Sequence, residues 1–255
     1  MIFETHAHYD DRAFDEDRDQ LLLSLADGGI EAVVNVGASI QTTKNTLDLM
    51  DKYPFVYGAV GVHPNETAEL TEDLMNWLEH ISRRPKVVAI GEIGLDYYWY
   101  KDNKEIQKEY FRRQLMIANE LDLPVIIHAR DAIQDTYDIL KEVDVKRKGV
   151  LHCYSGSMEM AKEFIKLGYY ISFSGTVTFK NNKRGVETAL EIDKNYLLCE
   201  TDAPYLTPVP NRGKPNKTAY VKYVYEFLSE LLKMDIEDLK MLTQNNYQKL
   251  FKEEI

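Results

Sequence analysis

The sequence has little cysteine and no long apolar run. Its two cysteines, Cys153 and Cys199, are too few for a disulfide framework, and neither has a neighbour at a zinc-knuckle spacing. No stretch approaches the run of about eighteen apolar residues that a membrane-spanning helix needs, and the N-terminus shows no signal-peptide pattern. We therefore expect a cytoplasmic protein with no membrane partner.

Positive charge is also scarce. The chain has 31 Lys and Arg against 42 Asp and Glu, which gives a formal net charge of -11. Such a balance argues against a surface that coats a nucleic-acid backbone. A local basic site is still compatible with this composition.

Short aliphatic runs alternate with longer, helix-periodic stretches along nearly the whole chain. The eight runs that we predict to be strands are 2–4, 32–36, 56–60, 87–91, 125–127, 149–151, 169–173 and 196–199. Helices are expected between them, for example over 14–26 and 104–121. Two further helices, about 218–232 and 236–250, close the chain, and Asp235 is expected to cap the second.

This alternation favours a closed barrel. No glycine-rich dinucleotide-binding turn follows the first predicted strand, which disfavours a doubly wound sheet. The length of 255 residues suits one barrel of eight βα units, and no repeat or linker composition divides the chain. The sequence therefore predicts an α/β fold with one domain over 1–255, a (β/α)8 TIM barrel with an additional C-terminal helix.

Most histidines stand where a barrel enzyme carries its active site. Five of the six lie at or just beyond the C-terminal end of a predicted strand, and these are His6, His8, His63, His128 and His152. Catalytic groups of TIM barrels gather at that face. Accident is a poor explanation for this distribution.

Two carboxylates, Glu92 and Asp202, follow the fourth and eighth predicted strands. Alternation along a strand predicts that Glu92 shares one face with Val88 and Ile90, and that Asp202 shares one with Glu200. A lone strand-end carboxylate is more often a helix cap or a surface charge. Here carboxylates and histidines together exceed what one closed zinc site needs and suit two divalent ions about 3.5 to 4 Å apart.

Six blocks of the sequence become specific when they are read together. They are 4–10 (ETHAHYD), 61–64 (GVHP), 91–98 (GEIGLDYY), 124–130 (PVIIHAR), 152–156 (HCYSG) and 200–206 (ETDAPYL). In this order they resemble the TatD family of metal-dependent deoxyribonucleases, within the amidohydrolase superfamily. The resemblance covers nearly the whole chain.

The resemblance implies a set of metal ligands and catalytic residues. The implied ligands are His6, His8, Glu92, His128, His152 and Asp202. Glu92 would bridge two ions, and Asp202 would orient the attacking water or accept its proton. His63 would act beside the scissile phosphate. One departure is visible, because the family usually has Asp where this chain has Glu4, whose expected role is to support the ligands.

Substrate contacts are expected from cations and aromatic rings. Arg130 follows His128 and offers a fork-shaped donor to phosphate, and Tyr154 lies in a block of the resemblance. The loops after the seventh and eighth strands, a frequent phosphate site in barrels, carry Lys180, Lys183 and Arg184, then Arg212, Lys214 and Lys217. Of these we favour Arg212. The aromatic run 97–100 could stack on bases or pack on the rim.

The sequence therefore predicts a hydrolase that uses two divalent ions, Mg, Mn, Zn or Co, to cleave DNA phosphodiester bonds. It would act exonucleolytically, on a DNA terminus or single strand, without an obligate protein partner. The alternative is an amidohydrolase-type enzyme that cleaves a C–N bond in a small molecule or an ester on an aminoacylated nucleic acid. That enzyme would need an apolar pocket, so Arg130 and Arg212 discriminate. A catalytically silent binding barrel is a third, weaker hypothesis.

Overall fold

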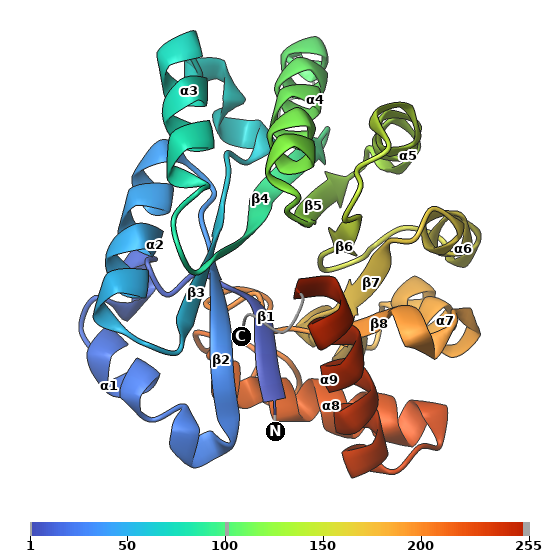
Figure 1. The fold of residues 1–255 in the computed structure, drawn as a ribbon. Helices are drawn as coiled ribbons and strands as arrows, with labels where there is room; N and C mark the ends of the chain where they lie inside the picture. Colours follow the sequence, from blue (N-terminus) through green and yellow to red (C-terminus); the bar gives the residue numbers. More distant parts are fainter. Residues whose placement is uncertain (1, 100–101, 252–255) are drawn as a thin grey trace.

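The computed structural model describes residues 2–99 and 102–251. Parallel strands follow one another in chain order around a nearly closed barrel, and the helices lie outside it (Figure 1). The strands are β1 (Ile2–Ala7), β2 (Ile30–Val36), β3 (Val56–Val60), β4 (Val87–Asp96), β5 (Val125–Arg130), β6 (Gly149–Leu151), β7 (Tyr170–Phe173) and β8 (Leu197–Cys199). The predicted TIM barrel is confirmed.

Helices follow the strands, and a further helix ends the described chain, as predicted. They are α1 (Arg18–Leu23), α2 (Ile40–Lys52), α3 (Glu72–Ile81), α4 (Lys104–Leu121), α5 (Ile133–Val143), α6 (Met158–Lys166), α7 (Lys183–Glu191), α8 (Val221–Leu232) and α9 (Ile236–Phe251). Asp235 accepts a hydrogen bond from the Glu237 N–H at the start of α9. Over 2–99 and 102–251, no helix has both the length and the apolarity to cross a bilayer.

One predicted helix, over 14–26, is broken in the structure. The short 3-10 helices η1 (Arg12–Phe14) and η2 (Ala26–Gly28) flank α1. The Asp11 carboxylate caps η1 by accepting the Ala13 N–H, and Asp17 leaves helical geometry with a φ of -134°. Polar side chains that bond to nearby backbone compete with a continuous helix. The remaining 3-10 helices are η3 (Pro64–Glu69), η4 (Gly175–Thr178), η5 (Lys194–Tyr196) and η6 (Thr218–Tyr220).

The barrel closes between β1 and the segment that follows β8. In the described part of the chain these two meet at an isolated bridge between Ala7 and Ala203 rather than along a ladder. Two main-chain bonds lie beside it: the Asp202 N–H donates to the His6 carbonyl at 2.9 Å, and the His8 N–H donates to the Ala203 carbonyl at 2.7 Å. The closure therefore sets two histidines beside Asp202.

Glu4 reinforces this closure from inside the protein. Its fully buried carboxylate accepts hydrogen bonds from the Thr201 N–H at 3.0 Å, the Thr201 hydroxyl at 2.7 Å and the His6 N–H at 3.2 Å. Burial raises the pKa of Glu4 to about 8, although the bonds from Thr201 oppose the rise. Glu4 therefore supports the backbone on both sides of the closure.

The fourth strand departs from regular alternation. Val88 and Ala89 both belong to the cluster inside the barrel, whereas Ile90 packs in the larger cluster that includes the helices. The register of β4 against β5 shifts between Ile90 and Ile93. The prediction that Val88, Ile90 and Glu92 share one face of the strand is therefore wrong. An irregularity of this kind re-aims a side chain, and here it precedes the inward-facing Glu92.

The last helix closes the end of the barrel opposite the C-terminal ends of the strands. Tyr247, Leu250 and Phe251 of α9 join the interior cluster with Phe3, from the start of β1. The Tyr247 ring stacks on the Phe3 ring with centroids 4.5 Å apart. Helix α9 thus completes the barrel core.

Removing the Tyr247 ring should therefore destabilise the barrel. We expect Tyr247→Ala to lower the free energy of unfolding by about 3 to 5 kcal/mol, the usual loss for a buried aromatic ring. The exposed neighbour Gln248 provides the matched control, and Gln248→Ala should change it by less than about 0.5 kcal/mol. Denaturant titration followed by circular dichroism measures both. Equal stability of the two variants would contradict the proposed role of α9.

Candidate metal centre

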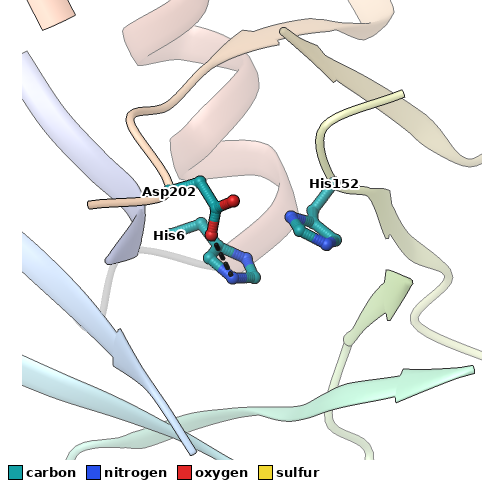
Figure 2. A group of neighbouring side chains, drawn as sticks. All are labelled: His6, His152 and Asp202. Carbon is teal, nitrogen blue, oxygen red and sulfur yellow. Dashed lines mark ion pairs between the residues drawn. The ribbon is translucent and has the colours of Figure 1, made fainter. Parts of the chain in front are cut away.

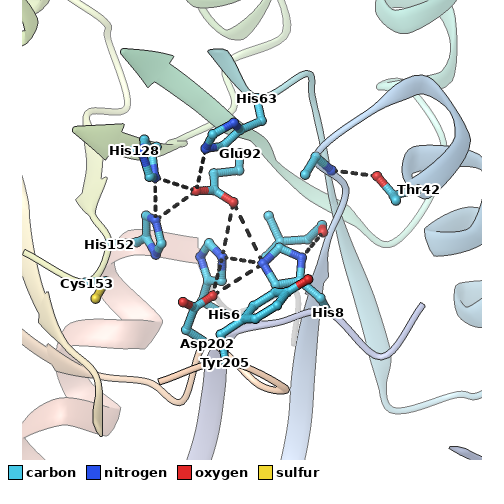
Figure 3. A network of polar contacts seen from close by, with 12 residues as sticks. His6, His8, Thr42, His63, Glu92, His128, His152, Cys153, Asp202 and Tyr205 are labelled. Atoms are coloured by element: carbon cyan, nitrogen blue, oxygen red, sulfur yellow. Dashed lines mark hydrogen bonds and ion pairs between the residues drawn. The ribbon is translucent and has the colours of Figure 1, made fainter. Parts of the chain in front are cut away.

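Side chains from different strands converge at the C-terminal end of the barrel (Figure 3). The structure brings together His63 and all six predicted ligands, namely His6, His8, Glu92, His128, His152 and Asp202. His6, Glu92 and His128 lie within strands β1, β4 and β5. The others directly follow a strand or lie in the segment just beyond one. The spatial grouping inferred from strand ends is therefore present.

Glu92 lies between two sets of imidazoles. Its Oε2 atom is 3.6 Å from His6 Nε2 and 3.7 Å from His8 Nε2. Its Oε1 atom is 2.8 Å from His128 Nδ1 and 2.8 Å from His152 Nε2. One carboxylate oxygen thus faces each set, which is the arrangement that a bridging carboxylate needs.

The first set has the spacing of ligands around one ion. His6 Nε2 and His8 Nε2 are 3.1 Å apart, and Asp202 Oδ1 lies 3.7 and 3.4 Å from them. Ligand atoms about 2.0 to 2.2 Å from a tetrahedral ion are separated from one another by roughly 3.3 to 3.6 Å. The two histidine nitrogens are within hydrogen-bond distance of each other, the Asp202 oxygen lies farther from both, and the overall spacing fits a shared divalent ion.

Further donor groups extend the cluster. His6, His152 and Asp202 form one group whose ligand atoms lie within 4.8 Å of one another, and His6 and His152 stack with ring centroids 4.0 Å apart (Figure 2). Another group joins His63 and Glu92 with His128. Because the groups share members, the cluster is continuous. Its imidazole and carboxylate donors fit divalent-metal binding.

The cluster has the electrostatics of a cation site. Burial opposes charge on Glu92, but attraction to His152 and hydrogen bonds from His128 and His152 outweigh it and hold the pKa of Glu92 well below the ordinary value. Burial also opposes charge on His8, yet hydrogen bonding and attraction to Asp202 raise the pKa of His8 to about 9. Protons and divalent ions compete for such lone pairs, so metal binding should release protons.

Sequence reasoning missed two carboxylates that position the histidines. Asp96 Oδ2 lies 3.2 Å from His128 Nε2, and Glu200 Oε1 lies 3.4 Å from His152 Nδ1. Contacts of this kind fix the orientation of a ligand ring. Both residues stand in the blocks that carry the family resemblance. The missing signal was the register of the sheet, in which Asp96 pairs with Arg130 beside His128.

Backbone groups position the first two histidines. His8 Nδ1 donates to the Val36 carbonyl at 2.7 Å, which leaves Nε2 free to bind an ion. Glu4 bonds to the backbone N–H of His6 rather than to a ring. The expected support from Glu4 therefore acts through the main chain.

His63 faces the cluster as a hydrogen-bond donor. Its Nδ1 accepts the Asn65 N–H at 3.2 Å, and its Nε2 is 3.6 Å from Glu92 Oε1. A neutral ring that accepts through Nδ1 carries its proton on Nε2. Burial, assisted by His128, lowers the pKa of His63 to about 3, so the ring stays neutral near pH 7.

The cluster opens into a cavity of about 440 Å³. Arg130 lines this cavity, as expected of a substrate contact, and its guanidinium lies over the Tyr98 ring at 4.0 Å. Trp99 and Tyr205 line the cavity as well. Tyr100, the last residue of the predicted aromatic run, lies outside the described residues.

Two predicted substrate contacts lie elsewhere. Tyr154 is buried and its hydroxyl donates to the Ser157 carbonyl at 2.8 Å, so the structure does not place it at the cavity. The Arg212 guanidinium lies over the Phe179 ring at 3.7 Å, outside the cavity wall. Lys180 lines a separate groove beside Phe179. The basic loops therefore do not meet the cluster.

Comparison with known proteins identifies the family. The model of the TatD related DNase family matches residues 3–252. The chain belongs to the TatD family. A TatD homologue from Escherichia coli, YjjV, has a crystal structure that superimposes with a TM-score of 0.93 at 32% identity, covering 98% of this chain and 97% of that one.

Curated TatD-family relatives agree on the general activity. The metal-dependent hydrolase YabD of Bacillus subtilis is 44% identical over 99% of both chains. The metal-dependent hydrolase YcfH of Escherichia coli is 36% identical over 98% of this chain and 96% of its own. Both are described as uncharacterized. The present chain is thus a metal-dependent hydrolase of the TatD family.

Glu92→Gln should weaken metal binding by this TatD-family hydrolase more than loss of an orienting carboxylate. Asp96→Asn, the matched control, should reduce affinity by about 10- to 100-fold, because Asp96 contacts the His128 ring but is not one of the predicted ligands. Glu92→Gln removes charge from the centre of both donor sets and should exceed that loss. Metal content after dialysis and titration with Zn²⁺ or Mn²⁺ measure the difference. Unchanged metal content in Glu92→Gln would contradict the role of Glu92 as a ligand shared by both donor sets.

His63→Ala should leave metal content nearly intact and lower turnover, because the hydrogen bond from the Asn65 N–H to Nδ1 of His63 favours the ring form that carries its proton on Nε2. Turnover should fall by about 10²- to 10⁴-fold, the range for loss of a positioned proton donor or acceptor. Elemental analysis of the purified variant decides the point. Loss of metal in step with activity would make His63 a ligand.

Proposed function

We propose that this hydrolase is a deoxyribonuclease that cleaves phosphodiester bonds at the ends of unpaired DNA strands. The observation that carries the proposal is that Arg130 and the metal cluster line the same cavity. In the described part of the chain, the Arg130 guanidinium has no hydrogen bond or ion pair with another side chain, and its contacts are with aromatic rings. Its donors are therefore available to an anion.

The Tyr98 ring orients the Arg130 guanidinium for binding of a phosphate. The ring covers one face of the guanidinium at 4.0 Å. Stacking holds the plane of the guanidinium and leaves its N–H groups, which lie in that plane, free to form paired bonds to phosphate oxygens. A lysine could not be held in this way.

The cluster residues have separate roles in the proposed reaction. Two divalent ions would supply an acidified water and polarise the phosphate. Glu92 would be shared between them, since each of its oxygens faces a different pair of histidines. Hydrogen bonding to His8, with attraction to His6, holds the pKa of Asp202 below its ordinary value despite burial, so Asp202 is ionised and can accept a proton. His63 Nε2–H would donate to a phosphate oxygen.

The alternative reaction is hydrolysis of a C–N bond, or of an ester on an aminoacylated nucleic acid. A small neutral substrate would not use the Arg130 donors, which have no partner among the described side chains and suit an anion. A net charge of -11 disfavours contacts with many phosphates along a duplex, so binding of a few nucleotides near a strand terminus is the more favourable mode. A cytoplasmic location and the lack of an obligate protein partner remain predictions from the sequence.

A degradation assay tests the proposal directly. End-labelled single and double strands of DNA would be incubated with the protein and Mg²⁺, Mn²⁺, Zn²⁺ or Co²⁺. We expect metal-dependent shortening of the single strand from one end. Hydrolysis of a neutral activated ester with no cleavage of any strand would favour the alternative reaction.

Arg130→Ala should lower kcat/KM for an oligonucleotide by about 10- to 150-fold, the loss of one charge-assisted phosphate contact. Activity on a neutral activated ester should be unchanged. Arg212→Ala is the matched control, because Arg212 lies outside the cavity wall, and its effect should be small. Salt should weaken oligonucleotide binding less steeply in Arg130→Ala than in the unaltered protein. An equal loss of kcat/KM on the oligonucleotide and on the neutral ester would show that Arg130 does not bind the phosphate.

A further inference from the structure

Exposed aromatic rings gather at the mouth of the metal cavity. Among the residues that the structure describes, the exposed aromatic side chains are Tyr98 at 49%, Trp99 at 63% and Tyr205 at 51%. Trp99 and Tyr205 line the cavity, and Tyr98 meets Trp99 edge to face at 4.8 Å. Such exposure forgoes favourable burial. Its concentration at one cavity indicates a ligand with flat apolar faces.

Trp99 is tied to the metal cluster through one buried carboxylate. Asp96 Oδ1 accepts the N–H of Tyr98 at 2.8 Å and that of Trp99 at 3.1 Å. The other oxygen, Oδ2, faces His128 Nε2 at 3.2 Å. The Arg130 guanidinium lies closer to the Tyr98 ring, at 4.0 Å, than to the Trp99 ring, at 5.7 Å, and Trp99 is the more exposed of the two, so Trp99 is the ring of this pair that is freer to receive a ligand.

Tyr205 lies beside the other donor set of the cavity. Its ring lies beside that of His8, with centroids 6.0 Å apart (Figure 3). Its hydroxyl donates to Asp11 Oδ2 at 2.6 Å. The hydrogen bond fixes the ring by its edge, while half of its surface stays exposed. Tyr205 is therefore an aromatic surface held in place near His8, whereas Trp99 is linked to His128 through Asp96.

We propose that Trp99 and Tyr205 stack on the bases of the nucleotides that flank the scissile phosphate, and so select unpaired strands. This inference rests on the proposed deoxyribonuclease function. A phosphate between Arg130 and the cluster carries one nucleoside on each side, and both must extend toward the mouth. Bases within a duplex are stacked on their neighbours, whereas an unpaired end offers free faces. Stacking accepts any base, because every base has a π-face.

The kinetic test uses strands that differ only in their bases. One is a single-stranded oligothymidylate, and its partner substrate has the same phosphates but abasic sites in its terminal nucleotides. Trp99→Leu should raise KM for the base-bearing strand by about 5- to 150-fold, with little change for the abasic strand. Trp99→Phe should retain most of the preference, and Tyr205→Leu and Tyr205→Phe should behave in parallel. Met116→Ala, at another exposed apolar residue, outside the cavity, is the control.

A binding test provides a readout that does not depend on turnover. The chain has two tryptophans, so a Trp77→Phe background leaves Trp99 as the sole tryptophan. A non-hydrolysable oligothymidylate should quench its fluorescence in a saturable titration, because a stacked base quenches an indole, and the abasic strand should not. Quenching by both strands alike would overturn the stacking proposal.

The outcomes separate this inference from the function on which it rests. If the unaltered protein cleaves neither strand with any of the four metals, the deoxyribonuclease proposal fails. If it cleaves both strands equally well, the deoxyribonuclease proposal stands and the stacking proposal fails. Equal effects of Trp99→Leu on the two strands, or no effect on either, would also overturn it.

Discussion

Closure of the barrel between β1 and the segment after β8 is the constraint on which the metal centre depends. The two segments share an isolated bridge instead of a ladder, so side-chain bonds must help to hold them. Glu4 supplies these bonds by joining Thr201 to the backbone of His6. The donor atoms of His6 and Asp202 are close because this closure holds. The bonds of the Glu4 carboxylate go to backbone and hydroxyl donors.

The fold and most of the cluster could be predicted because they follow from the regular alternation of strands and helices along the chain. Parallel strands of a barrel all end at one face, so residues such as His128 and Asp202 meet there even though they are far apart in sequence. That inference needs the order and direction of the strands, and tolerates errors of a few residues in their bounds. The inference placed Glu92 in the cluster even though β4 extends to Asp96, five residues beyond the end predicted for that strand.

What failed to emerge from the sequence depends on local three-dimensional detail. The position of Glu92 follows a shift in the register of β4, which alternation cannot foresee. Tyr154 stands two residues after His152, yet its hydroxyl bonds to its own loop. Arg212 has a basic neighbourhood like that of a phosphate site, but it stacks on Phe179. Residue type gives the chemistry available at a position, whereas the backbone path decides where that chemistry points.

Asp96 shows how the chain couples its metal ligands to the mouth of the cavity. One oxygen faces the ring of His128, and the other holds the backbone of Tyr98 and Trp99. Tyr98 in turn stacks on Arg130, which is the register partner of Asp96 in the β4–β5 ladder. A displacement of this loop would therefore disturb the ligand ring and the cation together. Because one carboxylate contacts both the His128 ring and the backbone of Tyr98 and Trp99, the positions of the ligand ring and of the aromatic loop both depend on the end of β4.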